Sequence, residues 1–336
     1  MRIFKYIFIL TSLLSCREKN SIRKNFIVGN AFGTTYNIQF YSKLDVNIQK
    51  GIDSTVKRVN KSVSTYLYNS DISRINRGDT TVVTDSIFRD IFHISKKIHL
   101  LTNGYFDPTV GVLRNAYGFG DVKPLEKLDK KTLDSLMTFV GFRKVILLKN
   151  GKILKKHPQI YIDFNAIAKG YGIDCIGKYL EKKGIKNYLI ELGGEILTKG
   201  KHVDTGKPWI VGIESINSKL ENRSVATTVA LENIAMASSG NYRKFRVDSL
   251  TGKKYVHTIN PLTGSAEQSD VLSATVLAST CAVADAYATA FMALGFNKSK
   301  EVLKNTKEIE VYLTYTDSLN NHQTFLSKGF KKVVLE

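Results

Sequence analysis

The chain has 336 residues, of which 43% are hydrophobic, and it carries a formal net charge of +19 at pH 7. This composition supplies ample material for a hydrophobic core, and we find no low-complexity linker, long charge block or repeat of fixed period. A basic chain suits nucleic acid, anionic lipid or a phosphate-rich ligand. Because it carries no zinc-finger, homeodomain or RNA-binding signature, we expect no nucleic-acid partner.

The N-terminal residues are typical of an export signal. Arg2 and Lys5 precede an apolar stretch over residues 7–14, far shorter than the ~20 apolar residues of a membrane-spanning helix. The stretch ends in LLSC at residues 13–16, which resembles the bacterial lipobox, where the cysteine is lipidated and becomes the first residue. The alternative is an ordinary signal peptide cut near Cys16.

We therefore expect a lipoprotein signal peptide at residues 1–15, a lipid anchor on Cys16, a polar tether at residues 16–25 and one folded unit at residues 26–336. The anchor predicts a bacterial cell-envelope protein that faces the periplasm from the inner or the outer membrane. Loss of the signal peptide lowers the net charge from +19 to +17, and a basic surface facing anionic lipid is the simplest interpretation of that charge.

The first half of the folded unit contains one strand pattern, two helix patterns and a hairpin. Residues 36–41 have the composition of a strand. Apolar residues then recur at helical spacing over residues 48–63 and again over residues 87–101. The turn dipeptide Asn150-Gly151 predicts a β-hairpin over residues 144–156, with φ > 0 at both turn residues.

Strand patterns dominate the second half. We predict helices over residues 168–183 and 281–294, each stopped by a glycine, and strands over residues 188–192, 209–214, 227–231, 273–278, 309–315 and 332–335. Because the strands come in runs and do not alternate with helices, we predict an α+β fold with mixed, largely antiparallel sheets and packed helices. The glycine-rich signatures of Rossmann and P-loop nucleotide sites do not occur at any strand-to-helix junction.

One pair of oxygen side chains on the late helix suits a hard metal ion. Asp285 and Thr289 are four residues apart, so they share one face of a helix made otherwise of small apolar residues. Mg2+ takes oxygen ligands, often one or two carboxylates together with substrate phosphate. Alternatively, Asp285 caps or solvates the helix and Thr289 bonds back to the backbone.

Three further segments place polar or aromatic residues beside turns or helix starts. Lys169 puts a positive charge in the first turn of a helix, where the helix dipole disfavours it, so it is either held for a ligand or a surface lysine. Residues 103–111 predict either a loop against a flat ring or a tight surface turn. His257 suits a general base, because histidine side chains exchange protons near neutral pH, although a lone histidine is more often structural.

In this order, the segments resemble the signature set of the ApbE family, the FAD:protein FMN transferases. The resembling segments are GTTY (33–36), STY (64–66), SDISRIN (70–76), FDPTVGVL (106–113), IDFNAIAKGYGID (162–174), ELGGE (191–195), SSGNYR (238–243), HTINPLTG (257–264) and ADAYATA (284–290). Three residues depart from the usual pattern. Phe32 replaces a common methionine, Glu195 an aspartate or asparagine, and Asn260 the aspartate before the proline.

The resemblance implies a Mg2+-dependent transferase that splits FAD and attaches FMN through a phosphoester to a Ser or Thr hydroxyl of an acceptor flavoprotein, releasing AMP. The acceptor it implies is a subunit of a membrane redox complex. An FAD pyrophosphatase and a non-catalytic flavin-binding lipoprotein are the alternatives.

The resemblance also implies site residues. Mg2+ would be held by Asp285, Thr289 and the backbone carbonyl of Ala166. Lys169 would add a fixed positive charge, and either His257 or Asp285 would act as the base. The expected FAD contacts are Phe32, Tyr66, Tyr105, Phe106, Asp107, Asp163, Lys169 and Ile259.

Overall fold

The computed structural model describes residues 22–43, 47–125, 128–218, 224–241, 245–247, 252 and 254–335. Cys16, the expected signal peptide and most of the expected tether lie outside the described residues, as do Tyr242 and Arg243 of the SSGNYR segment.

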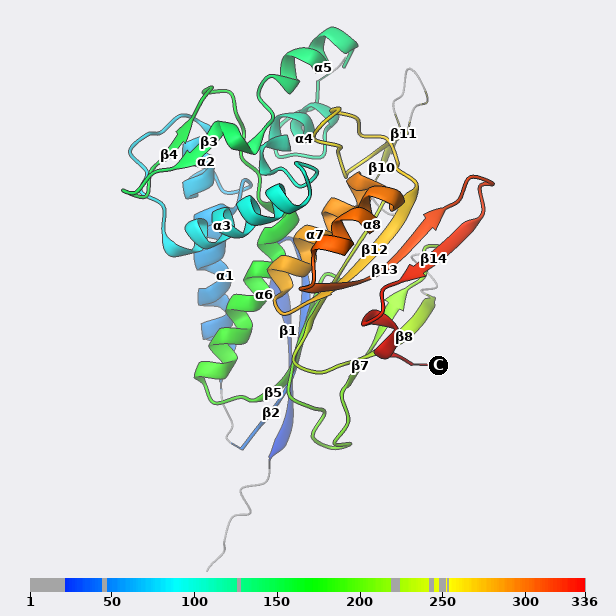
Figure 1. The fold of residues 1–336 in the computed structure, drawn as a ribbon. Helices are drawn as coiled ribbons and strands as arrows, with labels where there is room; N and C mark the ends of the chain where they lie inside the picture. Colours follow the sequence, from blue (N-terminus) through cyan, green and yellow to red (C-terminus); the bar gives the residue numbers. More distant parts are fainter. Residues whose placement is uncertain are drawn as a thin grey trace, which may run out of the picture.

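An eight-stranded sheet forms the centre of the molecule, and each neighbouring pair of its strands is antiparallel (Figure 1). In order across the sheet, the strands are β1 (Arg23–Ala31), β2 (Thr34–Ser42), β5 (Asn187–Leu192), β6 (Glu195–Lys199), β9 (Ala235–Gly240), β12 (Val271–Ala278), β13 (Ile309–Thr316) and β14 (His322–Leu326). The predicted α+β fold with largely antiparallel sheets is confirmed.

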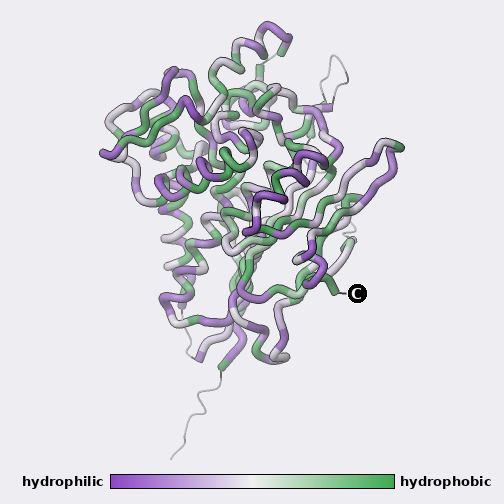
Figure 2. Tube along the Cα trace, viewed as in Figure 1, coloured by the Kyte–Doolittle hydropathy of each residue, from purple (hydrophilic) through white to green (hydrophobic). Residues whose placement is uncertain are grey.

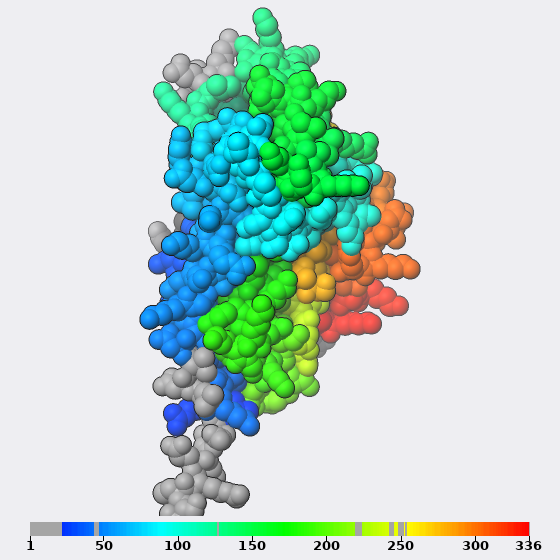
Figure 3. Space-filling view, turned by 90° about the vertical axis from the view of Figure 1, so that its left-hand side faces the viewer, coloured from blue at the N-terminus to red at the C-terminus, as the bar shows by residue number. Residues whose placement is uncertain are grey.

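Layers of structure cover both faces of this sheet. On one face lie α1 (Gln49–Val63), α6 (Asn165–Lys182) and α7 (Cys281–Leu294), and Figure 3 shows α6 at the surface between α1 and the start of α7. On the other face lies a three-stranded sheet of β7 (Trp209–Glu214), β8 (Val225–Leu231) and β15 (Val334–Leu335). Successive side chains of strand β9 point to opposite faces of the large sheet. Ala235 and Ala237 belong to the cores on the helix side, whereas Met236 packs with the smaller sheet.

The remaining elements lie mostly above this core. They are α2 (Asp71–Asn76), α3 (Ser86–Leu101), α4 (Gly111–Tyr117), α5 (Lys130–Met137), α8 (Phe296–Asn305), the hairpin strands β3 (Val145–Leu147) and β4 (Ile153–Lys155), the pair β10 (Phe245–Val247) and β11 (Lys254–Val256), and 3-10 helices at Pro108–Val110, Phe142–Lys144 and Phe330–Lys332. The outer turns of α8 are hydrophilic, and so are the flanks of the β13–β14 hairpin tip, whose turn carries the exposed Leu319 (Figure 2). No helix among the described residues is long and apolar enough to cross a membrane.

Helical spacing and capping explain the two helices predicted in the first half. In α1 the apolar spacing buries Ile52, Val59 and Val63. In α3 the N-cap residue Asp85 accepts a hydrogen bond from the backbone N–H of Phe88 at 2.9 Å. Both predictions are confirmed.

Some boundaries differ from the sequence predictions. Helix α6 begins at Asn165 and not at residue 168, and residues 332–335 form only the short β15 after a 3-10 helix. Residues 23–25 of the expected tether belong to β1, where they pair with β2.

The predicted turn of the β3–β4 hairpin is wrong in one respect. Positive φ occurs at Gly151 but not at Asn150. The Gly151 N–H donates to the carbonyl of Leu148 at 2.9 Å, and the Leu148 N–H donates to the carbonyl of Lys152 at 2.9 Å. The loop is therefore one residue longer than the predicted turn, and Gly151 closes it in the left-handed conformation.

The N-terminus of α7 is capped by a residue of another helix. Its own N-cap residue, Thr280, makes no side-chain capping bond. Instead, the buried carboxylate of Asp174 in α6 accepts hydrogen bonds from the backbone N–H groups of Cys281 at 2.8 Å and Ala282 at 2.9 Å. This contact fixes the start of α7 against α6.

Asp174→Ala is expected to lower the free energy of unfolding by about 2–4 kcal/mol, because two buried N–H groups lose their acceptor. Urea unfolding measures this loss. The matched control is Asp129→Ala, which removes the exposed cap of α5, a 2.9 Å bond from the Thr132 N–H, and should cost about 1 kcal/mol or less. Equal losses in the two variants would contradict the assigned role of Asp174.

Candidate active site

The close crossing of α6 and α7 brings the expected metal ligands together. Gly170 permits this crossing, because a Cβ atom at that position would lie 2.4 Å from the carbonyl oxygen of Cys281. The backbone N–H of Gly170 donates to Oδ2 of Asp285 at 3.1 Å. The carboxylate on α7 is therefore tied to the first turns of α6.

Asp285 is buried with only 6% of its surface exposed. Burial raises the pKa of its carboxyl, and the positive charge of Lys169 and the Gly170 N–H partly offset that rise. A buried carboxylate of this kind is stable as an anion only when a cation lies beside it.

Two further oxygen donors are expected beside Asp285 from helix geometry. Thr289, one turn along α7, is partly exposed, as is Ala166 in the first turn of α6. In a regular helix the Ala166 carbonyl accepts from the N–H of Gly170, the same N–H that Asp285 binds, so the two oxygens lie close together. This donor set of a carboxylate, a hydroxyl and a carbonyl fits Mg2+. Among the described residues, no group of three or more His, Cys, Asp or Glu side chains could hold a metal ion.

A partly buried ion pair joins the first turns of α6 to β6. The ammonium of Lys169 pairs with Oε1 of Glu195, and Oε2 of Glu195 is buried with no hydrogen-bond partner. Burial, followed by the charge of Asp285, raises the pKa of Glu195 to about 7. Burial opposes the charge on Lys169, but the negative charges of Glu195 and Asp285 raise its pKa above the usual value. Lys169 is thus held as a cation near Asp285.

The raised pKa of Glu195 predicts a change of stability with pH. Because this pKa lies above its ordinary 4.5, the folded protein binds the proton more tightly than the unfolded chain does. The stabilisation is complete below about pH 4.5 and is lost as the pH rises to about 7. Urea unfolding in EDTA should therefore show wild type losing stability relative to Glu195→Gln between about pH 5 and pH 8. A constant difference would contradict this assignment.

Phe32 lies in a strained turn beside α6. It connects β1 to β2 together with Gly33, with φ of +51° and +77°, a conformation that is uncommon for a bulky residue. Its ring lies against Gly172 of α6, where a Cβ atom would come within 2.4 Å of the ring. An open cavity of about 520 Å³ is lined by residues 30–35, Val56 and Asn60. The strain is consistent with the expected flavin contact at Phe32.

The two tyrosines expected to contact FAD differ in their surroundings. Tyr66 lies in the segment after α1 and is 63% exposed. The hydroxyl of Tyr105 accepts a hydrogen bond from the ammonium of Lys298, which also lies 4.8 Å from the centre of the Tyr105 ring.

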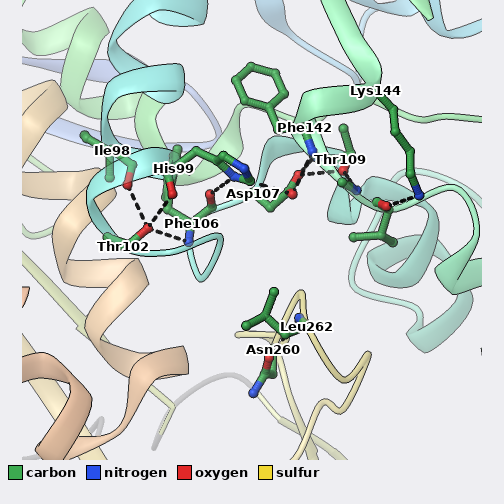
Figure 4. A network of polar contacts seen from close by, with 12 residues as sticks. Ile98, His99, Thr102, Phe106, Asp107, Thr109, Phe142, Lys144, Asn260 and Leu262 are labelled. Atoms are coloured by element: carbon green, nitrogen blue, oxygen red, sulfur yellow. Dashed lines mark hydrogen bonds and ion pairs between the residues drawn. The ribbon is translucent and has the colours of Figure 1, made fainter. Parts of the chain in front are cut away.

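Phe106 and Asp107 stabilise a buried loop (Figure 4). Phe106 belongs to the core. The Asp107 carboxylate accepts from the backbone N–H groups of Thr109 and Phe142, both at 2.8 Å. Leu262 faces this loop, and a Cβ at Gly104 would lie 3.3 Å from it. The polar atoms of Asp107 are used within the protein, so an FAD contact there stays a prediction.

The last three expected residues lie near α4 and the loop after β11. Asp163 pairs with Arg114 of α4 and accepts from the N–H of Asn165 at 2.7 Å, where α6 begins. Ile259 is buried in a small core with Leu113 of α4, whereas His257 is partly exposed.

Comparisons with known proteins agree with this architecture. The ApbE family model matches residues 32–313. An FAD:protein FMN transferase of Haemophilus influenzae is 33% identical over 334 residues, covering 96% of this chain and 94% of that protein. The solved structure of the flavin transferase ApbE from Vibrio cholerae superposes with a TM-score of 0.83 at 30% identity, covering 93% of this chain and 100% of that one. The chain belongs to the ApbE family.

As a member of the ApbE family, the protein is an enzyme of the transferase class. A further relative, the FAD:protein FMN transferase of Vibrio cholerae, is 32% identical over 310 residues and covers 90% of each chain.

Three residues that contribute to this site were not named as site residues from the sequence. Asp174 is only one residue of a longer motif, yet it caps α7. Arg114 follows the FDPTVGVL segment directly and pairs with Asp163. Glu195 stands out only as a departure from the ApbE pattern, yet it pairs with Lys169. An acid directly after a glycine pair was the available signal for Glu195.

Proposed function

We propose that this protein is a Mg2+-dependent FAD:protein FMN transferase that attaches FMN to a Ser or Thr hydroxyl of an acceptor flavoprotein and releases AMP. The observation that carries this proposal is the buried carboxylate of Asp285, which is tied to the Gly170 N–H at the α6–α7 crossing and lies within the influence of the Lys169 charge. The names of the relatives supply the substrate class, since they are called FAD:protein FMN transferases.

The reaction is a phosphoryl transfer. The acceptor hydroxyl attacks the phosphorus on the FMN side of the FAD diphosphate, the bond to the AMP oxygen breaks, and the hydroxyl proton passes to a base. Asp285, Thr289 and the carbonyl of Ala166 would hold Mg2+, which would supply positive charge beside the diphosphate and the leaving oxygen. Lys169, held as a cation by Glu195, adds a second positive charge.

The flavin half of FAD needs a flat apolar surface. Phe32 offers its ring beside α6 in a turn whose strain fixes its position, and the exposed Tyr66 offers a second ring. Tyr105, Phe106, Asp107, Asp163 and Ile259 complete the proposed FAD-binding set. Four of these side chains are buried, so they act by shaping the loops around FAD: Phe106, Asp107, Asp163 and Ile259.

His257 and Asp285 remain the two candidates for the base, and metal binding by Asp285 favours His257. His257→Asn is expected to lower kcat by about 10²–10⁴-fold, the usual contribution of a general base, with little change in the affinity for Mg2+. Steady-state kinetics at saturating FAD measures this. A kcat within threefold of wild type would assign the base to Asp285.

The nearest alternative is an FAD pyrophosphatase, in which water replaces the acceptor hydroxyl. Counting products separates the two. AMP release should be slow with FAD and Mg2+ alone, should accelerate when an acceptor with a target Thr is added, and should match the covalently bound FMN one to one. If the rate of AMP release is the same with and without the acceptor, the protein is a hydrolase and the transferase proposal is wrong.

We also propose that the mature protein is a lipoprotein anchored through Cys16 and facing the periplasm, with a membrane redox subunit as acceptor. The lipobox-like LLSC at residues 13–16 supports this proposal. Wild type expressed in bacteria should incorporate labelled fatty acid and sediment with membranes, and Cys16→Ser should lose the label. If the Cys16→Ser variant still incorporates the labelled fatty acid, the proposed lipid attachment at Cys16 is wrong.

A further inference from the structure

We infer that the end of the molecule at which β1 begins is a membrane-binding surface for anionic lipid, separate from the lipid on Cys16. This inference extends the proposed localisation and does not depend on the proposed reaction. It rests on a cluster of basic residues, a row of exposed apolar residues and the position of the tether.

Basic side chains gather at this end, which we call the basic end. All are exposed, and they are Arg23, Lys24, Lys43, Lys182, Lys183, Lys186, Lys199, Lys201 and Lys207. Sheet register brings them together, because Lys24 pairs with Tyr41 of β2, which in turn pairs with Asn187 of β5. The Asn187 side chain accepts from the N–H of Lys201 at 2.9 Å. Figure 3 shows the start of β1 and the C-terminal end of α6 at the same lower end of the molecule.

Few acidic groups in the described residues oppose this charge. Glu181 lies 3.6 Å from Lys199 and also accepts from the Tyr188 hydroxyl, and Glu232 lies 3.8 Å from Lys201. Asp204 accepts from the hydroxyl of Tyr41 at 2.7 Å. The other basic residues of this end have no carboxylate of the described chain within ion-pair distance: Arg23, Lys24, Lys43, Lys182, Lys183, Lys186 and Lys207. Their charges are therefore available to an anionic partner.

Exposed apolar residues line the first half of β1, starting at the basic end. Ile22, Phe26 and Val28 are 47%, 62% and 57% exposed. Phe26 and Val28 share one face of β1, the edge strand of the large sheet, with Lys24, and Ile22 directly precedes the strand in the same alternation. Apolar side chains flanked by lysine and arginine suit the boundary between lipid headgroups and acyl chains.

The short tether indicates that a membrane is the partner of the basic end. Seven residue steps separate Cys16 from Arg23, and a fully extended chain spans about 3.5 Å per residue, so β1 begins within about 25 Å of the anchor. Lys183, at the C-terminal end of α6, lies at the basic end, whereas Lys169 lies in the active site. With a rise of 1.5 Å per residue, the length of α6 between these two lysines keeps the active site within about 20 Å of the basic end. The acceptor hydroxyl should stand at a similar distance from the membrane.

Vesicle binding tests this inference with the mature chain from residue 16 carrying Cys16→Ser, so that no lipid is attached. We expect it to sediment with vesicles of phosphatidylglycerol and phosphatidylcholine, to stay in solution with phosphatidylcholine alone, and to be released by salt. The variant Lys182→Glu/Lys183→Glu/Lys186→Glu should bind at least about tenfold more weakly. The control Lys123→Glu/Lys130→Glu/Lys131→Glu makes the same charge change near α5, at the other end, and should bind as the parent does.

A second readout reports on β1 itself. Phe26→Trp, in a chain whose single native tryptophan is buried, should show a blue-shifted emission on adding the anionic vesicles. Three outcomes would each overturn the inference: binding to neutral vesicles, an equal loss of binding in the two triple variants, or an unshifted emission of the Phe26→Trp variant. FMN transfer to a soluble acceptor should be unchanged in both triple variants, which separates this inference from the proposed reaction.

Discussion

Asp285→Ala is expected to lose FMN transfer and FAD hydrolysis together, by about 10³-fold or more. The loss follows because the variant removes the one carboxylate among the proposed Mg2+ ligands, and metal stabilisation of a phosphoryl transfer is worth several kcal/mol, with about 1.4 kcal/mol for each factor of ten. AMP release at saturating FAD and Mg2+ measures both reactions in one assay.

Asp285→Asn separates this loss from misfolding. Its side chain keeps the size of aspartate and still offers an oxygen to the N–H of Gly170, but it carries no charge. Because burial disfavours the charged form of Asp285, the Asn variant should be at least as stable as wild type in EDTA and still be inactive. An active Asp285→Asn variant with ordinary Mg2+ dependence would remove Asp285 from the metal site.

Gly170→Ala is expected to damage both the fold and the reaction. The added Cβ atom would lie 2.4 Å from the Cys281 carbonyl oxygen and 2.8 Å from the Ala282 nitrogen, so α6 and α7 must separate. We expect the free energy of unfolding to fall by about 2–4 kcal/mol through overpacking and loss of the Asp174 cap. A displacement of about 1 Å at the reacting groups should lower kcat by about 10²-fold.

Gly212→Ala in β7 provides the control for Gly170→Ala. The atoms nearest to a Cβ at Gly212 belong to the Val225 side chain, the first of them at 3.1 Å, and a side chain yields more easily than the backbone of a second helix. Urea unfolding should show a change below about 1 kcal/mol, and activity should be unaffected. Equal effects of the two substitutions would contradict the importance of the helix crossing.

Periodicity and composition predicted the helices and strands whose sequence signals lie within the element itself. The spacing of apolar residues in α1 and the small apolar residues of α7 identified both helices, and the glycines after α6 and α7, Gly184 and Gly295, both have the positive φ of a helix stop. The turn at Asn150 could not be predicted correctly, since the same dipeptide also fits the longer loop that Gly151 closes. The first residues of strand β1 resemble a tether because they are polar and the outer face of the strand is exposed.

Without the family resemblance, local spacing could predict the candidate site only where its residues are neighbours in sequence. Asp285 and Thr289 share a helix face, so their spacing revealed them as a pair. The Asp174 cap and the Lys169–Glu195 ion pair join residues far apart in the chain, and nothing in the local pattern of either partner indicates the other. The close crossing at Gly170 is likewise a property of two helices and not of one.

The intact mass of a purified acceptor protein tests the central claim most directly. After incubation with this protein, FAD and Mg2+, the acceptor should gain the mass of one FMN less one water on its target hydroxyl. The gain should vanish in EDTA, with Asp285→Ala, or when the target Thr is replaced by Val. An acceptor of unchanged mass while AMP is released would contradict the account, as would full flavin attachment in EDTA.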